Sequence, residues 1–340
     1  MNDNSESFPR PKHKNDDNHA HINFGQDPRP NLQKYGYCVV EHVLSDGECN
    51  NTIDEIWMWL EGLGTGIKRK DKITWDNDHW AFCIRQGLIQ HTMGQEEFAW
   101  KIREHPNVIQ VYSQIFNTDK LLVSFGSVGV YRPIETGYVN CTNSSWLHTD
   151  QDIISKPLEE IYTSDDYSVQ GIINLEESED NDAGFFIGEG SHLLHSKLFE
   201  NNGMQPVNNW YVLTKQDVIF LQNHNIQFYK INASKGSFIL FDSRAIHSGF
   251  PHQKGRKIPR FRYTLYISLS PAIRATEKDI NKKIQAVKEG RNTNHWSSNN
   301  IKIFPIPNNN CTPYMIRKEN IPDWKNWNIK RKQLAGLIPY

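Results

Sequence analysis

The sequence predicts a mainly β fold with flanking helices, in which a double-stranded β-helix (a cupin-like jelly roll) forms the core and helices pack outside it. The first observation is a series of short β-rich runs between residues 119 and 275, separated by turns of Gly, Asn and Asp. The second is that these runs do not alternate with amphipathic helices, as the strands of parallel α/β folds do. The third is the helical periodicity of segments before and after this stretch.

The expected strands of the core are rich in β-branched and aromatic residues, and each ends at a turn. They are Leu121–Phe125, Val128–Tyr131, Val169–Leu175, Gly184–Ile187, Asp217–Leu221, Ser237–Phe241 and Arg262–Ser268. The segments 154–166 and 201–210 are interpreted as insertions at the mouth of the barrel. Loops in such positions commonly decide which molecules enter.

Helices are expected on both sides of this core. A strand-like run, Tyr37–Val43, leads into Ser45-Asp-Gly-Glu48, which has the form of a capping box. Pro106 suits the first turn of a later helix that ends near Phe116. After the core, residues 276 to about 289 have helical periodicity. The helix after the capping box carries one apolar face, formed by Ile53, Ile56, Trp57 and Leu60.

These features divide the chain into a tail, one domain and an extension. Residues 1–30 are polar and contain four prolines, so we expect them to be disordered. Residues 31–275 form the domain, with a helical layer at 31–118 and the jelly-roll core at 119–275. Residues 276–340 form a helical and irregular extension, which we expect to pack on the outside of the barrel.

Composition restricts the classes of partner. The formal net charge of −1 on 340 residues gives no global attraction to nucleic acid or to an acidic membrane surface. The five cysteines are odd in number and lack a Cys-x-x-Cys pair, which is typical of reduced thiols. Neither a signal pattern nor an apolar run long enough to cross a bilayer is present. We therefore expect an intracellular, cytoplasmic protein with no membrane span and no nucleic-acid partner; its oligomeric state stays open.

The candidate metal ligands are His148, Asp150 and His247. On an extended strand the side chains of His148 and Asp150 leave the same face, because side-chain direction alternates. About one or two His-x-Asp/Glu patterns are expected by chance, so the pair needs support from its surroundings. His247 follows an apolar strand that can return beside the first pair in a jelly roll. Two histidines and one carboxylate form the facial triad of non-haem Fe(II) oxygenases.

An arginine follows on the next expected strand. Arg262 and Thr264 are two residues apart, so both side chains point to one face, where a guanidinium and a hydroxyl suit a carboxylate. Arg260 shares this alternation and is the main alternative. Lys254, Arg256, Lys257 and Arg260 also form a basic loop. This loop is interpreted as solvated, with a phosphate-binding entrance for a CoA thioester as the alternative.

The order of these motifs resembles the phytanoyl-CoA dioxygenase family of Fe(II)/2-oxoglutarate oxygenases. The resemblance covers roughly residues 121–271. It rests on His148-Thr-Asp150, Gly188-Glu-Gly-Ser-His192, Gly236-Ser-Phe-Ile-Leu-Phe-Asp242, His247-Ser-Gly249 and Arg262.

The resemblance implies a non-haem dioxygenase that hydroxylates an organic substrate and releases succinate and CO2. His148, Asp150 and His247 would bind Fe(II), with O2 as the second substrate. Arg262, with help from Thr264, would bind the distal carboxylate of 2-oxoglutarate; Arg260 is the alternative. Gln170 and Tyr131 are further candidates for contacts with this cosubstrate. In this family the stretch that contains His192 and His195 is a structural turn.

Two other functions are compatible with the sequence. One is a catalytically inactive cupin-like binding module, and the other is an interaction protein that uses the acidic insertion and the aromatic tail. For the enzyme, the expected substrate is a small or lipid-like molecule. The resemblance does not identify it.

Overall fold

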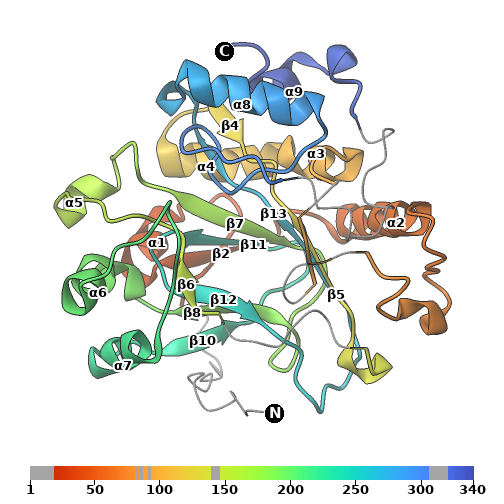
Figure 1. The fold of residues 1–340 in the computed structure, drawn as a ribbon, viewed down its shortest axis with the longest axis horizontal. Helices are drawn as coiled ribbons and strands as arrows, with labels where there is room; N and C mark the ends of the chain where they lie inside the picture. Colours follow the sequence, from red (N-terminus) through yellow and green to blue (C-terminus); the bar gives the residue numbers. More distant parts are fainter. Residues whose placement is uncertain (1–18, 82, 84–86, 91–92, 139–145, 306–320) are drawn as a thin grey trace.

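A computed structural model describes residues 19–81, 83, 87–90, 93–138, 146–305 and 321–340. Two antiparallel-rich sheets face each other, and helices cover their outer faces (Figure 1). The predicted fold class, mainly β with helices outside, is therefore confirmed. Within the described residues, no helix is both long and apolar enough to cross a membrane.

The larger sheet has the strand order β1-β2-β11-β7-β13-β5-β3. Only the pair of β1 and β2 at one edge is parallel. The strands are β1 (His21–Asn23), β2 (Tyr37–Glu41), β3 (Leu88–Ile89), β5 (Val128–Tyr131), β7 (Val169–Asn174), β11 (Phe238–Asp242) and β13 (Arg262–Tyr266).

The smaller sheet has the order β10-β8-β12-β6-β9, and all its pairs are antiparallel. A separate two-stranded ribbon joins β4 to β14. The strands of both are β4 (Leu121–Val123), β6 (His148–Thr149), β8 (Gly184–Gly188), β9 (Tyr211–Val212), β10 (Phe228–Ile231), β12 (His247–Phe250) and β14 (Leu269–Pro271).

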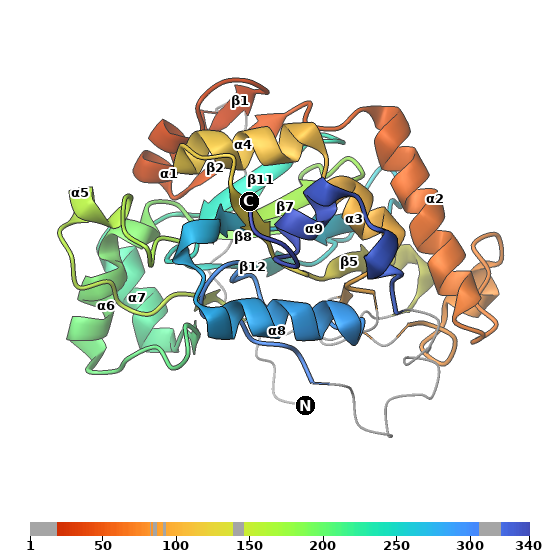
Figure 2. The same ribbon diagram turned by 90° about the horizontal axis from the view of Figure 1, so that it is seen from above.

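The helices lie mainly on the outer side of the larger sheet, where α3, α4, α8 and α9 form one layer (Figures 1 and 2). The helices α6 and α7 flank the smaller sheet. The helical bounds are α1 (Arg29–Tyr35), α2 (Asp46–Gly62), α3 (Glu97–Arg103), α4 (Pro106–Phe116), α5 (Leu158–Ile161), α6 (His195–Asn202), α7 (Lys215–Asn223), α8 (Glu277–Lys288) and α9 (Ile329–Leu334).

Alternation along the strands builds the core on both faces of each sheet. On β11, Phe238 and Leu240 pack under the helical layer, whereas Ile239 and Phe241 point between the sheets. On β8, Phe186 packs toward α6 and α7, while Phe185 and Ile187 point inward. A period of two therefore divides each strand between two apolar clusters.

Two local signals predicted from the sequence form as expected. Ser45 and Glu48 make a reciprocal capping box at the start of α2, and the predicted apolar face of this helix is buried. Pro106 occupies the first turn of α4, which ends at Phe116 as predicted.

Two expectations were wrong. Residues 19–30 are not a disordered tail, because β1 pairs with β2 and α1 begins at Arg29; residues 1–18 lie outside the described part. The expected strand Asp217–Leu221 is part of α7. Thr214 and Asp217 form a capping box there, and Val218 and Leu221 are buried at helical spacing.

The extension after residue 275 packs outside only in part. The helices α8 and α9 do cover the outer side of the larger sheet (Figure 1). Residues 293–297, after α8, turn back toward the interior, where Thr293 donates to the backbone of Phe125 and Ser297 to that of Ser268. The expectation of a purely external extension is therefore corrected.

Lys283 on α8 is buried without a carboxylate partner in the described structure. Its Nζ donates to the carbonyl oxygen of Val123 at 2.6 Å and lies 4.4 Å from the ring centroid of Phe125. Burial, together with the nearby Arg103 guanidinium, lowers the pKa of Lys283 to about 7. Folding therefore favours the neutral amine.

Lys283→Met is expected to raise the free energy of unfolding at pH 6 by on the order of 1–3 kcal/mol, because it removes a buried charge. Above pH 7 the amine of Lys283 loses its proton in the folded state but keeps it in the unfolded state, so the free energy of unfolding of the wild type rises with pH. The difference in the free energy of unfolding between Lys283→Met and the wild type therefore shrinks toward pH 10. Urea unfolding at pH 6 and pH 10 measures both effects. Lys278→Met, at an exposed position on the same helix, is the control. A difference that does not depend on pH would contradict the prediction.

Candidate metal centre

The metal centre begins with a cross-strand pair. His148 on β6 and His247 on β12 are direct partners in the antiparallel register, so their side chains leave the same face. The Oδ2 of Asp150 lies 3.6 Å from His148 Nε2 and 3.5 Å from His247 Nε2. One ligand atom from each of the three residues falls within 4.8 Å of the others. The fold thus joins the three residues predicted from the sequence.

The backbone orients both imidazoles. His148 Nδ1 lies 2.8 Å from the carbonyl oxygen of Trp146, and His247 Nδ1 lies 3.0 Å from that of Ala245. A carbonyl only accepts, so each Nδ1 carries the proton and each Nε2 keeps its lone pair for a metal. The Trp146 ring also stacks on His148, with ring centroids 4.1 Å apart.

The protonation states suit a cation. Burial alone raises the pKa of Asp150, but the charge of His148 and hydrogen bonds with both histidines outweigh it, so the pKa lies well below its usual value. Burial and the charge of His148 lower the pKa of His247. An ionised Asp150 carboxylate and a neutral His247 imidazole are forms that bind a divalent metal.

This donor set fits Fe(II). Two imidazole nitrogens and one carboxylate oxygen converge, and no thiolate from the described residues, which would favour zinc, takes part. The described cysteines, Cys38, Cys49 and Cys83, are buried and do not belong to this group.

Gln170 on β7 lines the same cavity, but its position suggests a role different from the expected cosubstrate contact. Its Nε2 donates to Asp150 Oδ2 at 2.9 Å, so it orients the carboxylate. Such outer hydrogen bonds commonly change metal affinity by about 10- to 100-fold.

Gln170→Leu is therefore expected to weaken metal binding by about ten-fold while the fold is kept. Titration of the purified protein with Co(II), followed by its visible absorption, measures the change. Gln222→Leu, at an exposed position on α7, is the control. An unchanged affinity in Gln170→Leu would show that the hydrogen bond does not orient Asp150.

Arg262 also lines the cavity and carries donors that no described residue uses. It pairs with Tyr131 across β13 and β5, and its guanidinium carbon lies 4.9 Å from the Tyr131 ring centroid. Its Nε and Nη1 are buried without a hydrogen-bond partner. Because an unpaired buried guanidinium is costly, this group fits an anionic ligand such as a carboxylate.

The position of Thr264 gives weaker support for a contact with a ligand in the cavity. Its Oγ1 is buried and also lacks a partner, but the residue does not line the cavity. It packs against Gly129, where a Cβ atom would come within 2.5 Å of Thr264 Oγ1. The lack of a side chain at Gly129 therefore leaves room for the Thr264 hydroxyl.

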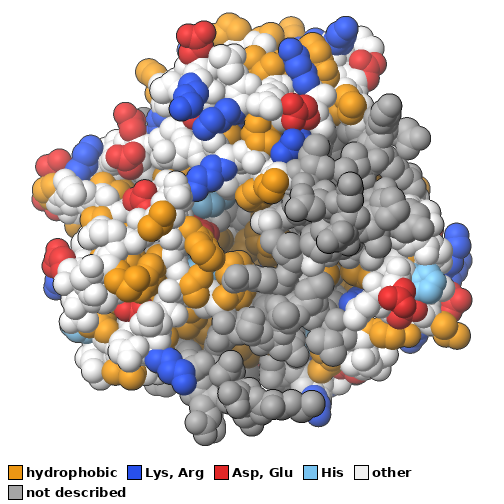
Figure 3. All heavy atoms as spheres, in the orientation of Figure 1, with side chains coloured by type: hydrophobic (Ala, Val, Ile, Leu, Met, Phe, Trp, Pro, Cys, Tyr) orange, Lys and Arg blue, Asp and Glu red, His pale blue; other side chains and the backbone are white. Residues whose placement is uncertain are grey.

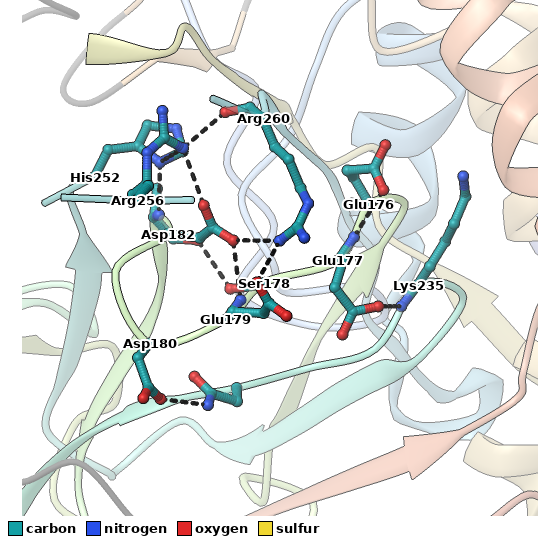
Figure 4. A network of polar contacts seen from close by, with 12 residues as sticks. Glu176, Glu177, Ser178, Glu179, Asp180, Asp182, Lys235, His252, Arg256 and Arg260 are labelled. Carbon is teal, nitrogen blue, oxygen red and sulfur yellow. Dashed lines mark hydrogen bonds and ion pairs between the residues drawn. The ribbon is translucent and has the colours of Figure 1, made fainter. Parts of the chain in front are cut away.

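Arg260 lies in a different environment, a network shown in Figure 4. Its Nη1 donates to Asp182 Oδ2 at 2.8 Å and to Glu179 Oε2 at 3.0 Å. Arg256 binds the other oxygen of Asp182 at 3.0 Å and also pairs with Glu135. Two of the four cations of the basic loop therefore neutralise acidic side chains. Neither arginine lines the cavity.

The sequence analysis missed a third side of the cavity. The cavity has a volume of about 460 Å³, and residues 293–304, from the extension, line part of it. His295 is the notable member: burial lowers its pKa to about 4, with the charges of His247 and His148 acting in the same direction and that of Asp150 against them. No motif or spacing links this segment to residues 148–150, so the sequence carries no signal for it.

His192 and His195 do not join the metal centre. His192 Nε2 lies 3.0 Å from the carbonyl oxygen of Gln33, and both residues are buried in a short 3-10 turn and the start of α6. Neither lines the cavity. Their placement agrees with a structural turn.

The chain is similar in sequence to a described family over most of its length. The family model described as phytanoyl-CoA dioxygenase (PhyH) matches residues 32–258. Ava biosynthesis cluster protein O of Aspergillus versicolor is 23% identical over 265 residues, 76% of this chain and 81% of that protein. A phytanoyl-CoA dioxygenase-like protein of Dictyostelium discoideum is 21% identical over 304 residues, 81% and 82% of the two chains.

Among solved structures, the non-haem α-ketoglutarate-dependent carbocyclase SnoK from nogalamycin biosynthesis is 13% identical, with a TM-score of 0.45. The likeness covers 71% of this chain and 81% of that one. The span matched by the family model contains His148, Asp150 and His247, and it ends before Arg262 and the segment 293–304.

Proposed function

This chain belongs to the phytanoyl-CoA dioxygenase family, and from that premise we propose that it is an Fe(II)/2-oxoglutarate-dependent oxygenase that hydroxylates a small organic molecule. The observation that carries the proposal is the convergence of His148, Asp150 and His247 in the lining of one cavity. Family membership alone would leave open whether the ligands are in place.

We assign His148, Asp150 and His247 as the iron ligands. Bound iron supplies the activation of O2 that couples oxidative decarboxylation of 2-oxoglutarate to oxygen insertion into a C–H bond. Asp150 contributes the negative charge, and Gln170 holds its carboxylate by a hydrogen bond. The Nδ1 contacts of both histidines keep their rings in the binding orientation.

We assign the distal carboxylate of 2-oxoglutarate to Arg262. Support comes from its two unpaired buried nitrogens, whereas Arg260 is already paired with Asp182 and Glu179. Tyr131 holds the guanidinium by stacking and lines the cavity beside it. Thr264 stays a weaker candidate, because a contact with the cosubstrate requires access to its buried hydroxyl.

Anaerobic titration of the protein with Fe(II) and then 2-oxoglutarate tests the assignment. We expect a weak visible charge-transfer band, followed on exposure to O2 by succinate formation. Iron binding without such a band would overturn the oxygenase assignment. A band without succinate, whichever substrate is added, would favour the inactive binding module instead.

A further inference from the structure

The segment after α8 forms a fixed side of the cavity, which we call the C-terminal wall. Hydrogen bonds hold it to the strands: Thr293 and Phe125 exchange bonds through the Phe125 backbone, and Ser297 Oγ donates to the Ser268 carbonyl. At its far end, Lys302 Nζ donates to the carbonyl oxygen of Asn208 at 3.0 Å. The cavity-lining members of the wall are Thr293, Asn294, His295, Trp296, Lys302 and Phe304.

The wall presents polar atoms that have no hydrogen-bond partner among the described residues. His295 Nε2 and Trp296 Nε1 are both buried and lack a hydrogen-bond partner, while both residues line the cavity. Buried polar groups without partners are costly, so two on one side of a cavity indicate a ligand that satisfies them. An indole N–H donates only, which requires an acceptor such as oxygen.

The charges around the cavity restrict that ligand. Apart from the metal centre and Arg262, which the proposed function already uses, Lys302 is the charged side chain among the described lining residues, and it is bonded to Asn208. The bond to a carbonyl oxygen leaves the charge of the exposed Lys302 in place, so a ligand with several phosphates would meet one cation at the wall.

The apolar part of the lining is aromatic and partly exposed. Trp210 and Val207, from the predicted insertion, are 44% and 68% exposed, and Phe304 and Trp296 face the same cavity. Figure 3 shows hydrophobic side chains gathered beside a hollow near the centre of this face. Flat aromatic side chains at a binding site favour flat apolar ligands.

We propose that the C-terminal wall binds the substrate, and that this substrate is a neutral, flat, largely apolar molecule with a hydroxyl or carbonyl oxygen that His295 and Trp296 recognise. The inference rests on the proposed function, because it names the substrate class of the same centre. It argues against CoA thioesters, because their several phosphates would meet one cation, Lys302, at the wall. Two of the four cations of the basic loop, Arg256 and Arg260, are held by Glu135, Glu179 and Asp182.

Equilibrium binding to the anaerobic Fe(II) and 2-oxoglutarate holoenzyme tests the inference with three probes: 2-naphthol, naphthalene and decanoyl-CoA. We expect 2-naphthol to bind about five-fold more tightly than naphthalene, which is roughly the effect of one net hydrogen bond. His295→Phe should remove this preference without changing naphthalene affinity. His295→Gln should restore part of it, since an amide can also hydrogen bond.

The charge-transfer band separates the possible failures. No band in the wild type means that the proposed function itself has failed. If the band is present in the wild type and in His295→Phe, then equal affinity for both neutral probes, or tighter binding of decanoyl-CoA, overturns the inference. Loss of the band in His295→Phe also overturns it, because His295 would then serve the metal centre. His224→Phe, at an exposed position after α7, should leave every value unchanged.

Discussion

His148→Ala is expected to abolish the Fe(II) and 2-oxoglutarate charge-transfer band and to lower succinate formation by on the order of 10³-fold or more. The substitution removes one of three ligands, and Asp150 and His247 alone cannot hold three sites on one face of the ion. Asp150 also loses a neighbour that lowers its pKa. The measurements are the anaerobic spectrum, bound iron per protein, and succinate by chromatography.

The matched control is His224→Ala, because His224 is exposed and lies outside the cavity. We expect it to keep the wild-type spectrum and turnover. If His148→Ala kept a full charge-transfer band, the metal would have to bind elsewhere, and the role of the His148–His247 cross-strand pair would be disproved.

Arg262→Gln should raise the KM for 2-oxoglutarate by about 100-fold, because it removes a charge-assisted contact to a carboxylate in a buried setting. Stability should change little or improve, since the guanidinium of Arg262 has buried nitrogens that no protein group satisfies. Steady-state kinetics with varied 2-oxoglutarate measures the first effect, and thermal unfolding measures the second. Arg262→Lys should recover only part of the affinity, because an ammonium lacks the planar fork.

Arg260→Gln tests the alternative that the sequence left open, in which Arg260 binds 2-oxoglutarate. It removes ion pairs with Glu179 and Asp182, so we expect a small loss of stability of about 1 kcal/mol or less and a KM within about two-fold of the wild type. A large rise in KM for Arg260→Gln with a normal Arg262→Gln would reverse the assignment of the two arginines.

Local patterns in the sequence were enough to predict much of the fold. The strand expected at Ser237–Phe241 and the capping box at Ser45 depend on neighbours within a few residues, and both form close to the predicted positions. The error at Asp217–Leu221 has a local cause as well. An apolar run of this length fits a strand or a buried helix, and the capping box from Thr214 decided for the helix.

The sequence also supplied the three candidate metal ligands in order, because the His-x-Asp spacing and a later histidine form a pattern along the chain. Only the tertiary structure decided how other groups reach the centre. Whether Arg260 or Arg262 has free donors depends on Asp182, about 80 residues away, and His295 reaches the cavity from an extension without a motif. The physical reason is that pairing between distant segments is set by packing and charge in three dimensions, which leave no periodic trace in the sequence.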